Sequence, residues 1–297
     1  MTVQNAKPLA GFIDLHIHTT ASDGTVAPAE VVETAYALGL EAVAITDHDC
    51  LNGISEAKEA GQRLGQEIIP GCELAAHTPY GEMHIVGLWA ENGNPGLEEL
   101  LATQREMRKT RNQEILLGLR RIGINLNDTD LAAEVDGGAS VGRPHIARAI
   151  VHKGFALSVQ DAFKRYLVPG KPAYVPRRLL PPEEILVVLK KAGITTIFAH
   201  PMSLPAPEAW IGREVVRLTE LGLLDGLEAY HPEHDRAKVQ YVEKLACELG
   251  LLLSGGSDFH GTVKPKIKMG VGEGRLRVPV ALLERIKARR VQAGLPV

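Results

Sequence analysis

Histidine and carboxylate residues recur in this sequence in pairs whose spacing suits the binding of divalent cations. His16 and His18 stand two positions apart, and Asp258 and His260 repeat that spacing near the other end of the chain. In a β-strand, side chains at i and i+2 point to the same side, so each pair can converge on one point. Imidazole and carboxylate groups are ligands that zinc, manganese and iron accept.

Further residues of these two types lie in short apolar segments or directly after them. Nine positions form the predicted set of metal-binding and catalytic residues: His16, His18, Asp23, His48, Glu73, His84, His200, Asp258 and His260. A single histidine taken alone is more often structural. Nine such groups buried together without cations, however, would be costly in free energy. The sequence therefore predicts a metal centre, in which the identity of the ions stays open.

The elements that must position these residues are short strands that alternate with helices. Strands are predicted at 12–18, 42–46, 67–73, 83–88, 195–200, 226–230 and 251–254, with a last short one near 269–271. Helices are predicted between them at 28–38, 53–64, 182–192, 209–221 and 236–249. The alternation indicates an α/β fold with a mainly parallel sheet, and seven strands favour a closed or distorted barrel. Barrel enzymes place their active sites at the carboxyl ends of the strands.

A run of predicted helices at 97–122, 128–134, 144–152 and 159–166 interrupts this alternation. Residues 101–172 carry 12 Lys and Arg against 7 Asp and Glu, although the whole chain has a formal net charge of −3. We expect a barrel domain over 10–96 and 176–290, and a helical insertion over 97–175 that forms a substrate-binding lid. The basic residues suit an anionic substrate, but they could equally do no more than solvate the helices.

The motifs, taken in order, resemble the PHP (polymerase and histidinol phosphatase) family. IDLHIHTTASDGT is followed by AITDHD, GCE, MHIVGL, FAHP and GSDFH. The insertion adds VGRPHIAR, DAFKRYL and PGKPAYVP, which resemble the subgroup that hydrolyses 3′,5′-nucleoside bisphosphates and trims short RNA from the 5′ end. The resemblance implies a distorted (β/α)7 TIM-like barrel, the PHP fold, with two or three divalent ions (Mn, Zn or Fe).

The resemblance also implies roles for individual residues. The first metal would be held by His16, His18, Glu73 and Asp258, the second by Asp23, His48 and His260, and the third by His84 and His200 with Glu73 as the bridge. Phosphate recognition would fall to three residues of the insertion: Arg143, His145 and Lys171. A metal-bridging hydroxide would then attack the phosphorus atom.

The predicted activity is therefore metal-dependent hydrolysis of phosphate esters of nucleotides. The substrate would be a 3′,5′-nucleoside bisphosphate such as pAp or the 5′ end of a short RNA, with inorganic phosphate as a product. Two alternatives stay open: a phosphatase for a small non-nucleotide ester such as histidinol phosphate, and a non-catalytic module that binds metal or nucleic acid. Neither a signal peptide nor a membrane-spanning apolar run is evident, so we expect a cytoplasmic protein without an obligate protein partner.

A few more residues could have either a site role or a structural one. Asp49 could orient the His48 imidazole or cap a strand end. His231 could face the substrate, and Arg177 could touch its far end or lie in a solvated loop. The step at Gly255–Gly256 would let the backbone pass close to the metals.

Overall fold

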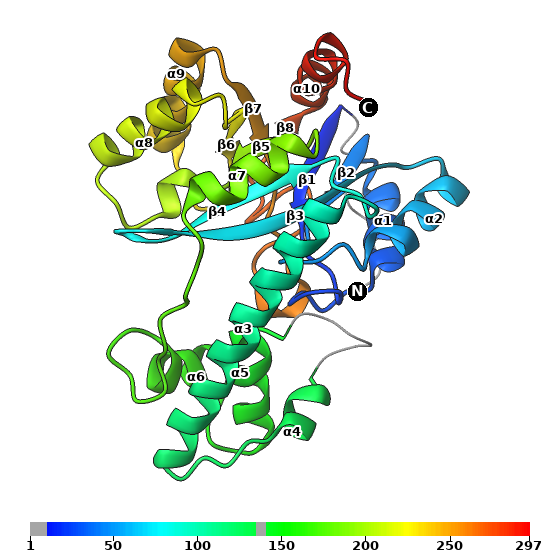
Figure 1. Ribbon diagram of the computed structural model, residues 1–297. Helices are drawn as coiled ribbons and strands as arrows, with labels where there is room; N and C mark the ends of the chain where they lie inside the picture. The colour runs from blue at the N-terminus through cyan, green and yellow to red at the C-terminus, as the bar shows by residue number, and fades with distance from the viewer. Residues whose placement is uncertain (1–10, 135–140) are drawn as a thin grey trace.

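The computed structural model describes residues 11–134 and 141–297, so the predicted domain start at residue 10 lies outside the described residues. Eight strands form one sheet in the order β7-β6-β5-β4-β3-β2-β1-β8 (Figure 1). They are β1 (Phe12–Ile17), β2 (Ala42–Ile45), β3 (Glu67–Thr78), β4 (Gly81–Leu88), β5 (Thr195–Phe198), β6 (Gly226–Tyr230), β7 (Leu252–Gly255) and β8 (Val278–Pro279).

The sheet curls until the segment after β7 meets β1. There the Asp258 N–H donates to the His16 carbonyl at 2.9 Å, and the His18 N–H donates to the Phe259 carbonyl at 3.0 Å. The predicted distorted, TIM-like barrel is therefore confirmed, and it is nearly closed. Because residues of a strand alternate between its two faces, Ala42 and Ala44 of β2 join one buried cluster while the intervening Val43 joins another.

The sheet is mainly parallel, as predicted, with antiparallel pairs at β4 and β8. Parallel pairs join β1 to β2, β2 to β3, β5 to β6 and β6 to β7. β4 is antiparallel to both of its neighbours because a tight turn at Pro79 and Tyr80 joins β3 and β4 as a hairpin. The first residues of β4 consequently lie at the barrel end where the parallel strands finish. β3 itself runs five residues beyond Glu73, its predicted last residue, to Thr78.

The predicted strand at 269–271 is wrong. These residues form a turn between Lys268 and Gly272, which pair as an isolated bridge. Gly270 and Gly272 have φ angles of 71° and 55°, which suit a turn and not a strand. The last strand is β8, antiparallel to β1, and it leads into a helix that the sequence analysis did not predict, α10 (Val280–Gln292).

Helices cover the outside of the barrel (Figure 1). They are α1 (Pro28–Leu38), α2 (Ile54–Leu64), α7 (Pro182–Lys191), α8 (Glu208–Glu220), α9 (Arg236–Leu249) and α10. Pro28 occupies the first turn of α1, where its missing N–H costs nothing, and Gly39 ends the helix with a left-handed φ of 74°. Gly65 and Gly250 end α2 and α9 in the same way.

A helical extension projects from the barrel on the long helix α3 (Figure 1). It contains α3 (Pro95–Arg121), α4 (Asp128–Ala132), α5 (Arg143–His152), α6 (Val159–Ala162) and a π-helical turn (Phe163–Leu167). Ile115 and Leu119 of α3 pack with Ile146 and Ile150 of α5 in a hydrophobic cluster separate from those of the barrel. The predicted domain limits at 97 and 175, and the lid function, stay predictions. Within the described ranges, no helix combines the length and the apolar character needed to cross a membrane.

Gly256 allows the close contact that closes the barrel. A Cβ atom at this position would lie 2.3 Å from the His16 Cβ and 2.4 Å from the His16 nitrogen. We expect Gly256→Ala to lower the free energy of unfolding by about 2 kcal/mol, because the added methyl group must push β1 away. Urea denaturation measures this loss. Gly96→Ala in α3 is the control, because the nearest atom to its Cβ would be 3.5 Å away; equal stability of the two variants would contradict the expectation.

Candidate metal centre

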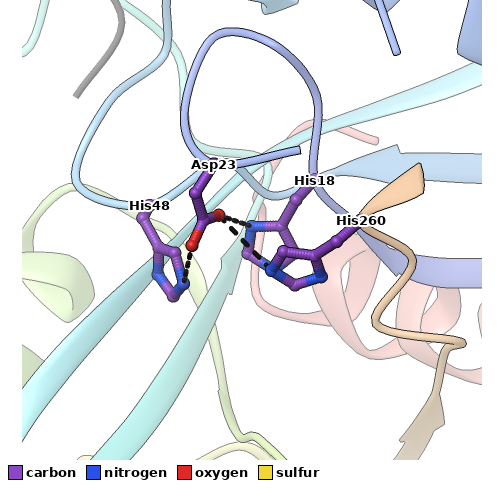
Figure 2. A group of neighbouring side chains, drawn as sticks. All are labelled: His18, Asp23, His48 and His260. Carbon is purple, nitrogen blue, oxygen red and sulfur yellow. Dashed lines mark ion pairs between the residues drawn. The ribbon is translucent and has the colours of Figure 1, made fainter. Parts of the chain in front are cut away.

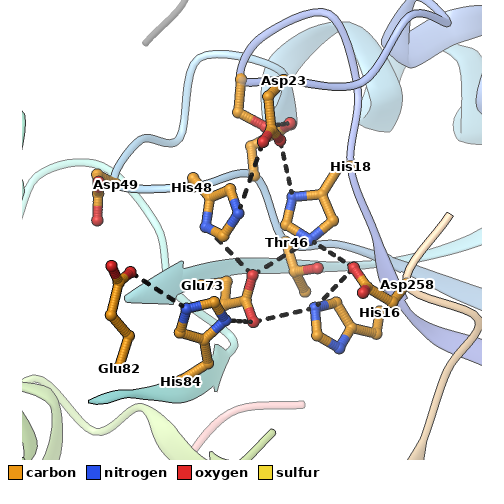
Figure 3. Close-up of polar contacts among 12 residues, drawn as sticks. His16, His18, Asp23, Thr46, His48, Asp49, Glu73, Glu82, His84 and Asp258 are labelled. Carbon is orange, nitrogen blue, oxygen red and sulfur yellow. Dashed lines mark hydrogen bonds and ion pairs between the residues drawn. The ribbon is translucent and has the colours of Figure 1, made fainter. Parts of the chain in front are cut away.

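All nine predicted ligand residues lie together at the end of the barrel where the parallel strands finish; Figures 2 and 3 label eight of them, and His200 contacts Glu73 in the same group. Glu73 of β3 is at the centre and is almost fully buried. Its Oε1 oxygen lies 3.0–3.4 Å from ring nitrogens of His16, His84 and His200. Its Oε2 oxygen lies 3.2–3.3 Å from ring nitrogens of His18 and His48. Five imidazoles thus surround one carboxylate.

Two aspartates complete the group from opposite ends of the sequence. Asp23 Oδ1 lies 3.3 Å from His260 Nε2, and Asp23 Oδ2 lies 3.9 Å from His48 Nε2 (Figure 2). Asp258 Oδ1 lies 3.3 Å from His18 Nε2 and 3.3 Å from His260 Nδ1. The two aspartates therefore approach the same histidines from different sides.

The donor atoms form three overlapping groups, in each of which all atoms lie within 4.8 Å of one another. The groups are His18, Asp23, His48 and His260; His16, His18 and Asp258; and His16, Glu73 and His200. They resemble the three predicted metal sites, but His18 joins the group of Asp23, and His84 is absent from the third group. The division of residues among individual metals stays a prediction.

Several buried donor atoms in this centre have no hydrogen-bond partner. They are His16 Nε2, both ring nitrogens of His18, Asp23 Oδ1 and His48 Nδ1. Burying a polar atom without a partner is unfavourable. Nitrogen and oxygen donors of this kind suit zinc, manganese or iron, so the residues fit a centre of divalent cations.

Glu228 of β6 is a site residue that the sequence analysis missed. His16 Nδ1 donates to Glu228 Oε1 at 3.0 Å, which leaves His16 Nε2 directed at Glu73. Glu228 Oε2 also accepts the backbone N–H of His200 at 2.7 Å. A carboxylate that holds the remote nitrogen of a ligand histidine orients the ring and fixes its tautomer. The signal was present in the sequence, since Glu228 is a charged residue inside the otherwise apolar segment GLEAY.

Lys264 and His231 both approach the second oxygen of Asp258. The Lys264 ammonium forms an ion pair with Asp258 Oδ2, and His231 Nε2 lies 3.6 Å from the same atom. Lys264 follows the GSDFH motif at a position that no local pattern marks, so only the folded chain identifies it. His231 lines the cavity of the metal centre, whose volume is about 170 Å³. The sequence alone leaves open whether this residue faces the substrate.

The backbone is unusual at three residues of the site. Asp49, His200 and Asp258 have φ angles of 54°, 31° and 52°. For residues with a Cβ this left-handed conformation costs about 1–3 kcal/mol, and it concentrates at functional sites. The surrounding contacts hold the backbone in this conformation, with the Asp258 N–H bonded to His16 and the Asp49 N–H bonded to the Glu73 carbonyl.

Opposite charges at the centre shift the pKa values of its groups. Burial alone would lower the pKa of His18 and of His84, but the neighbouring carboxylates raise these values to about 9 and about 10. Burial favours the neutral carboxyl of Glu73, yet the histidines around it hold its pKa well below the usual range. A divalent cation must therefore displace protons from the imidazoles when it binds, so its affinity falls as the pH falls.

Four arginines, Arg108, Arg111, Arg143 and Arg177, lie between the barrel and the extension; we name them the arginine cluster. Asp49 is fully buried and pairs with two of them. Arg108 donates to Asp49 Oδ2 through Nε at 2.9 Å and through Nη2 at 2.6 Å, and Arg177 Nη2 donates to the same oxygen at 2.6 Å. Asp49 thus binds arginines and does not orient His48. Arg177 is buried, so the alternative of a solvated loop is wrong.

Glu82 of β4 is the second carboxylate of the arginine cluster, but its contacts are long. Its carboxylate oxygens lie 3.8 Å from Arg111, 3.8 Å from Arg177 and 4.0 Å from Arg143. Arg111 Nη2 is buried and has no hydrogen-bond partner. Burial and the neighbouring arginines lower the pKa of Arg111 to about 10, so it remains charged at neutral pH. Four guanidinium groups face two carboxylates, and the cluster keeps positive charge for an anion.

The three predicted phosphate-binding residues occupy different environments. Arg143 begins α5 and belongs to the arginine cluster. His145 is buried, and its Nδ1 accepts the Gly142 N–H at 2.9 Å; burial lowers its pKa to about 4, so it is neutral. Lys171 is exposed, and among the described residues its ammonium has no ion-pair partner. Their role in phosphate recognition stays a prediction.

Comparison with known proteins agrees with this geometry. A model of the PHP domain matches residues 14–120. A 5′-3′ exoribonuclease of Haemophilus influenzae is 36% identical over 247 residues, which cover 83% of this chain and 89% of that protein. The chain belongs to the PHP family. A 3′,5′-nucleoside bisphosphate phosphatase of Chromobacterium violaceum is 32% identical over 248 residues, covering 84% of this chain and 87% of that protein.

The fold of a solved structure supports the same conclusion. A protein of Bifidobacterium adolescentis, described as a metal-dependent phosphoesterase, superimposes with a TM-score of 0.84 at 30% identity and covers 95% of this chain and 98% of its own. The predictions of a PHP-family enzyme and of a metal-dependent phosphoric ester hydrolase are therefore confirmed. The substrate and the identity and number of the metals stay predictions.

Removal of divalent cations should destabilise the protein, because the buried donors at the centre would lose their ligand. We expect a chelator to lower the midpoint of thermal unfolding by about 5 °C or more, and re-addition of the preferred ion to restore it. Mass spectrometry of the purified protein gives the metal content. Glu73→Gln should contain less metal and respond less to the chelator, whereas His77→Ala, at an exposed position of β3, should behave as wild type. An unfolding midpoint of the wild-type protein that does not change when the chelator is added would contradict the metal centre.

Proposed function

We propose that this protein hydrolyses nucleotides that carry two phosphate groups, with 3′,5′-nucleoside bisphosphates such as pAp and the 5′ ends of short RNA as its substrates. The observation that carries the proposal is the arginine cluster beside the metal centre. One phosphate would lie at the metals and be cleaved, and the other would lie among the arginines. A substrate with a single phosphate would leave the second site without an anion.

The two sites are joined by a short chain of contacts. His84 Nδ1 donates to Glu73 at 3.0 Å in the metal centre, and His84 Nε2 lies 3.9 Å from Glu82 in the arginine cluster (Figure 3). The helical extension supplies Arg108, Arg111 and Arg143, so it would cover the bound nucleotide as a lid. Arginine suits this task because its planar group can donate two parallel hydrogen bonds to a phosphate.

Two or three divalent ions of manganese, zinc or iron would supply the remaining chemistry, since bound cations lower the pKa of water and neutralise phosphate oxygens. The residues of the chain hold the reacting groups in place. Glu228 and Glu73 orient His16 from its two ring nitrogens. Lys264 at the cavity wall adds a positive charge near the phosphate. The names of the relatives, an exoribonuclease and a bisphosphate phosphatase, support both substrates.

The alternatives fit the arginine cluster less well. Histidinol phosphate has one phosphate and a cationic end, which the excess positive charge of the cluster would repel. A non-catalytic binding module would not require the strained backbone and the nine donor groups around one cavity.

Substrate comparison tests the proposal directly. We expect the protein loaded with Mn²⁺ to release phosphate from pAp with a kcat/KM at least about a hundredfold above that for histidinol phosphate, because the second phosphate adds interactions worth roughly 3 kcal/mol. His16→Ala, which removes a central ligand, should abolish release from both substrates. Equal values of kcat/KM for the two substrates would argue against the nucleotide preference, and full activity of His16→Ala would argue against the metal centre.

Arg111 should contribute to binding of the second phosphate. We expect Arg111→Met to raise KM for pAp by about tenfold or more, because a charge-assisted hydrogen bond to phosphate is lost, and to change KM for 3′-AMP by less than about twofold. Steady-state phosphate release measures both values. Arg121→Met, an exposed position at the end of α3, is the control. An equal loss on both nucleotides would indicate damage to the fold instead of loss of a phosphate contact.

A further inference from the structure

A groove of about 980 Å³ lies beside the metal centre, between the start of α9 and residues 273–277. Its wall includes the ring of Tyr230, at the end of β6, and the side chains of Arg236, Arg275 and Arg277. The volume is at the upper end of the range of sites that bind small molecules. The metal centre and the arginine cluster do not use these residues, so their presence calls for a separate explanation.

The groove adjoins the cavity of the metal centre. His231 and Glu233 line both spaces. His231 Nε2 lies 3.6 Å from Asp258 Oδ2, so the wall of the groove reaches a predicted metal ligand. A substrate bound at the metals would therefore reach the groove past only His231 and Glu233.

The groove and the arginine cluster lie on different sides of the metal centre. The arginine cluster contacts Asp49, which follows β2, and Glu82 on β4. The groove lies at the end of β6, and because the segment after β7 meets β1, β6 lies across the nearly closed barrel from β2 and β3. A nucleotide whose 5′ phosphate lies among the arginines and whose 3′ phosphate lies at the metals would point its 3′ side away from the cluster, toward the groove.

Two exposed arginines of the groove are available to contact phosphate groups. Arg236 and Arg275 are exposed, and among the described residues neither has a hydrogen-bond or ion-pair partner. Two acidic groups in the wall are already engaged by the protein: Asp235 accepts the Lys238 N–H at 2.9 Å as the cap of α9, and Glu243 accepts the Tyr230 hydroxyl at 2.6 Å.

With Glu233 and Glu273, the lining holds four carboxylates against three arginines, so attraction for phosphate would be confined to the surroundings of Arg236 and Arg275. The groove would therefore only position an RNA strand, and the arginine cluster and the metals would hold that strand in place. Tyr230 in the wall is half-buried, and its hydroxyl is held by Glu243, so it would contribute an aromatic side chain of fixed position.

We propose that this groove binds the part of an oligoribonucleotide that lies 3′ of the cleaved phosphate, with Arg236 and Arg275 contacting its backbone phosphates. The inference rests on the proposed nucleotide function and extends it. In both reactions water adds to the same phosphorus atom and the bond from phosphorus to the 3′ oxygen breaks. The 3′ oxygen leaves as a hydroxyl group with a proton from water. The phosphate is then free if the substrate is pAp, or stays on the 5′ oxygen of the next nucleotide if the substrate is RNA.

The test compares a short RNA with pAp in the same variants of the full-length, metal-loaded protein. The probe is a 5′-phosphorylated pentaribonucleotide, which fills the groove, whereas pAp ends at the metal centre. We expect the double variant R236E/R275E to lose about tenfold or more in kcat/KM on the RNA and less than about twofold on pAp. The salt dependence of RNA cleavage should weaken by about two units of logarithmic slope, one for each lost phosphate contact.

The matched control is Arg213→Glu, a charge reversal at an exposed position of α8 outside the groove. It should leave both activities unchanged. Equal losses on RNA and pAp in the double variant, or no loss on RNA, would overturn the role of the groove. Wild-type protein that cleaves pAp but not RNA would also overturn it and leave the phosphatase proposal intact. If the wild-type protein cleaves neither RNA nor pAp, both the proposed function and the proposed role of the groove are wrong.

Discussion

One buried carboxylate, Glu73, holds five imidazoles within 3.4 Å of its two oxygens, and much of the structure serves this arrangement. Buried imidazoles and carboxylates are unfavourable in free energy unless cations bind them and further residues hydrogen-bond to them. Glu228 holds His16 and the His200 backbone, and the close approach of Gly256 to β1 brings Asp258 to the same centre. The left-handed backbone at His200 and Asp258 is the conformational cost of this convergence.

The β3–β4 hairpin links the metal centre to the rest of the site. Because β4 returns antiparallel to β3, His84 and Glu82 lie at the same barrel end as the carboxyl termini of the parallel strands. His84 faces the metal centre through one ring nitrogen and Glu82 through the other. A parallel β4 would have placed its first residues at the opposite end of the barrel, away from both sites.

Electrostatics also joins the helical extension to the barrel. Asp49 and Glu82 are barrel residues, whereas Arg108, Arg111 and Arg143 belong to the extension, so the two parts meet through charge pairs. The carboxylates balance only part of the positive charge. The same contacts that hold the extension in place therefore leave an attractive site for phosphate next to the metals, and the groove at β6 lies on a different side of them.

The convergence of the nine predicted ligand residues could be anticipated from sequence because its signal is local: i, i+2 pairs and polar residues at the ends of short apolar strands. Apart from α10, the helices of the barrel and of the extension could likewise be predicted from their periodicity and their Pro and Gly boundaries. Only the tertiary structure identified the partners that are remote in sequence, such as Asp49 with Arg177 and Lys264 with Asp258, because neither member of such a pair marks the other along the chain. The position of the last strand at Val278–Pro279 instead of 269–271 was also decided there, since strand pairing depends on contacts across the sheet and not on residue pattern alone.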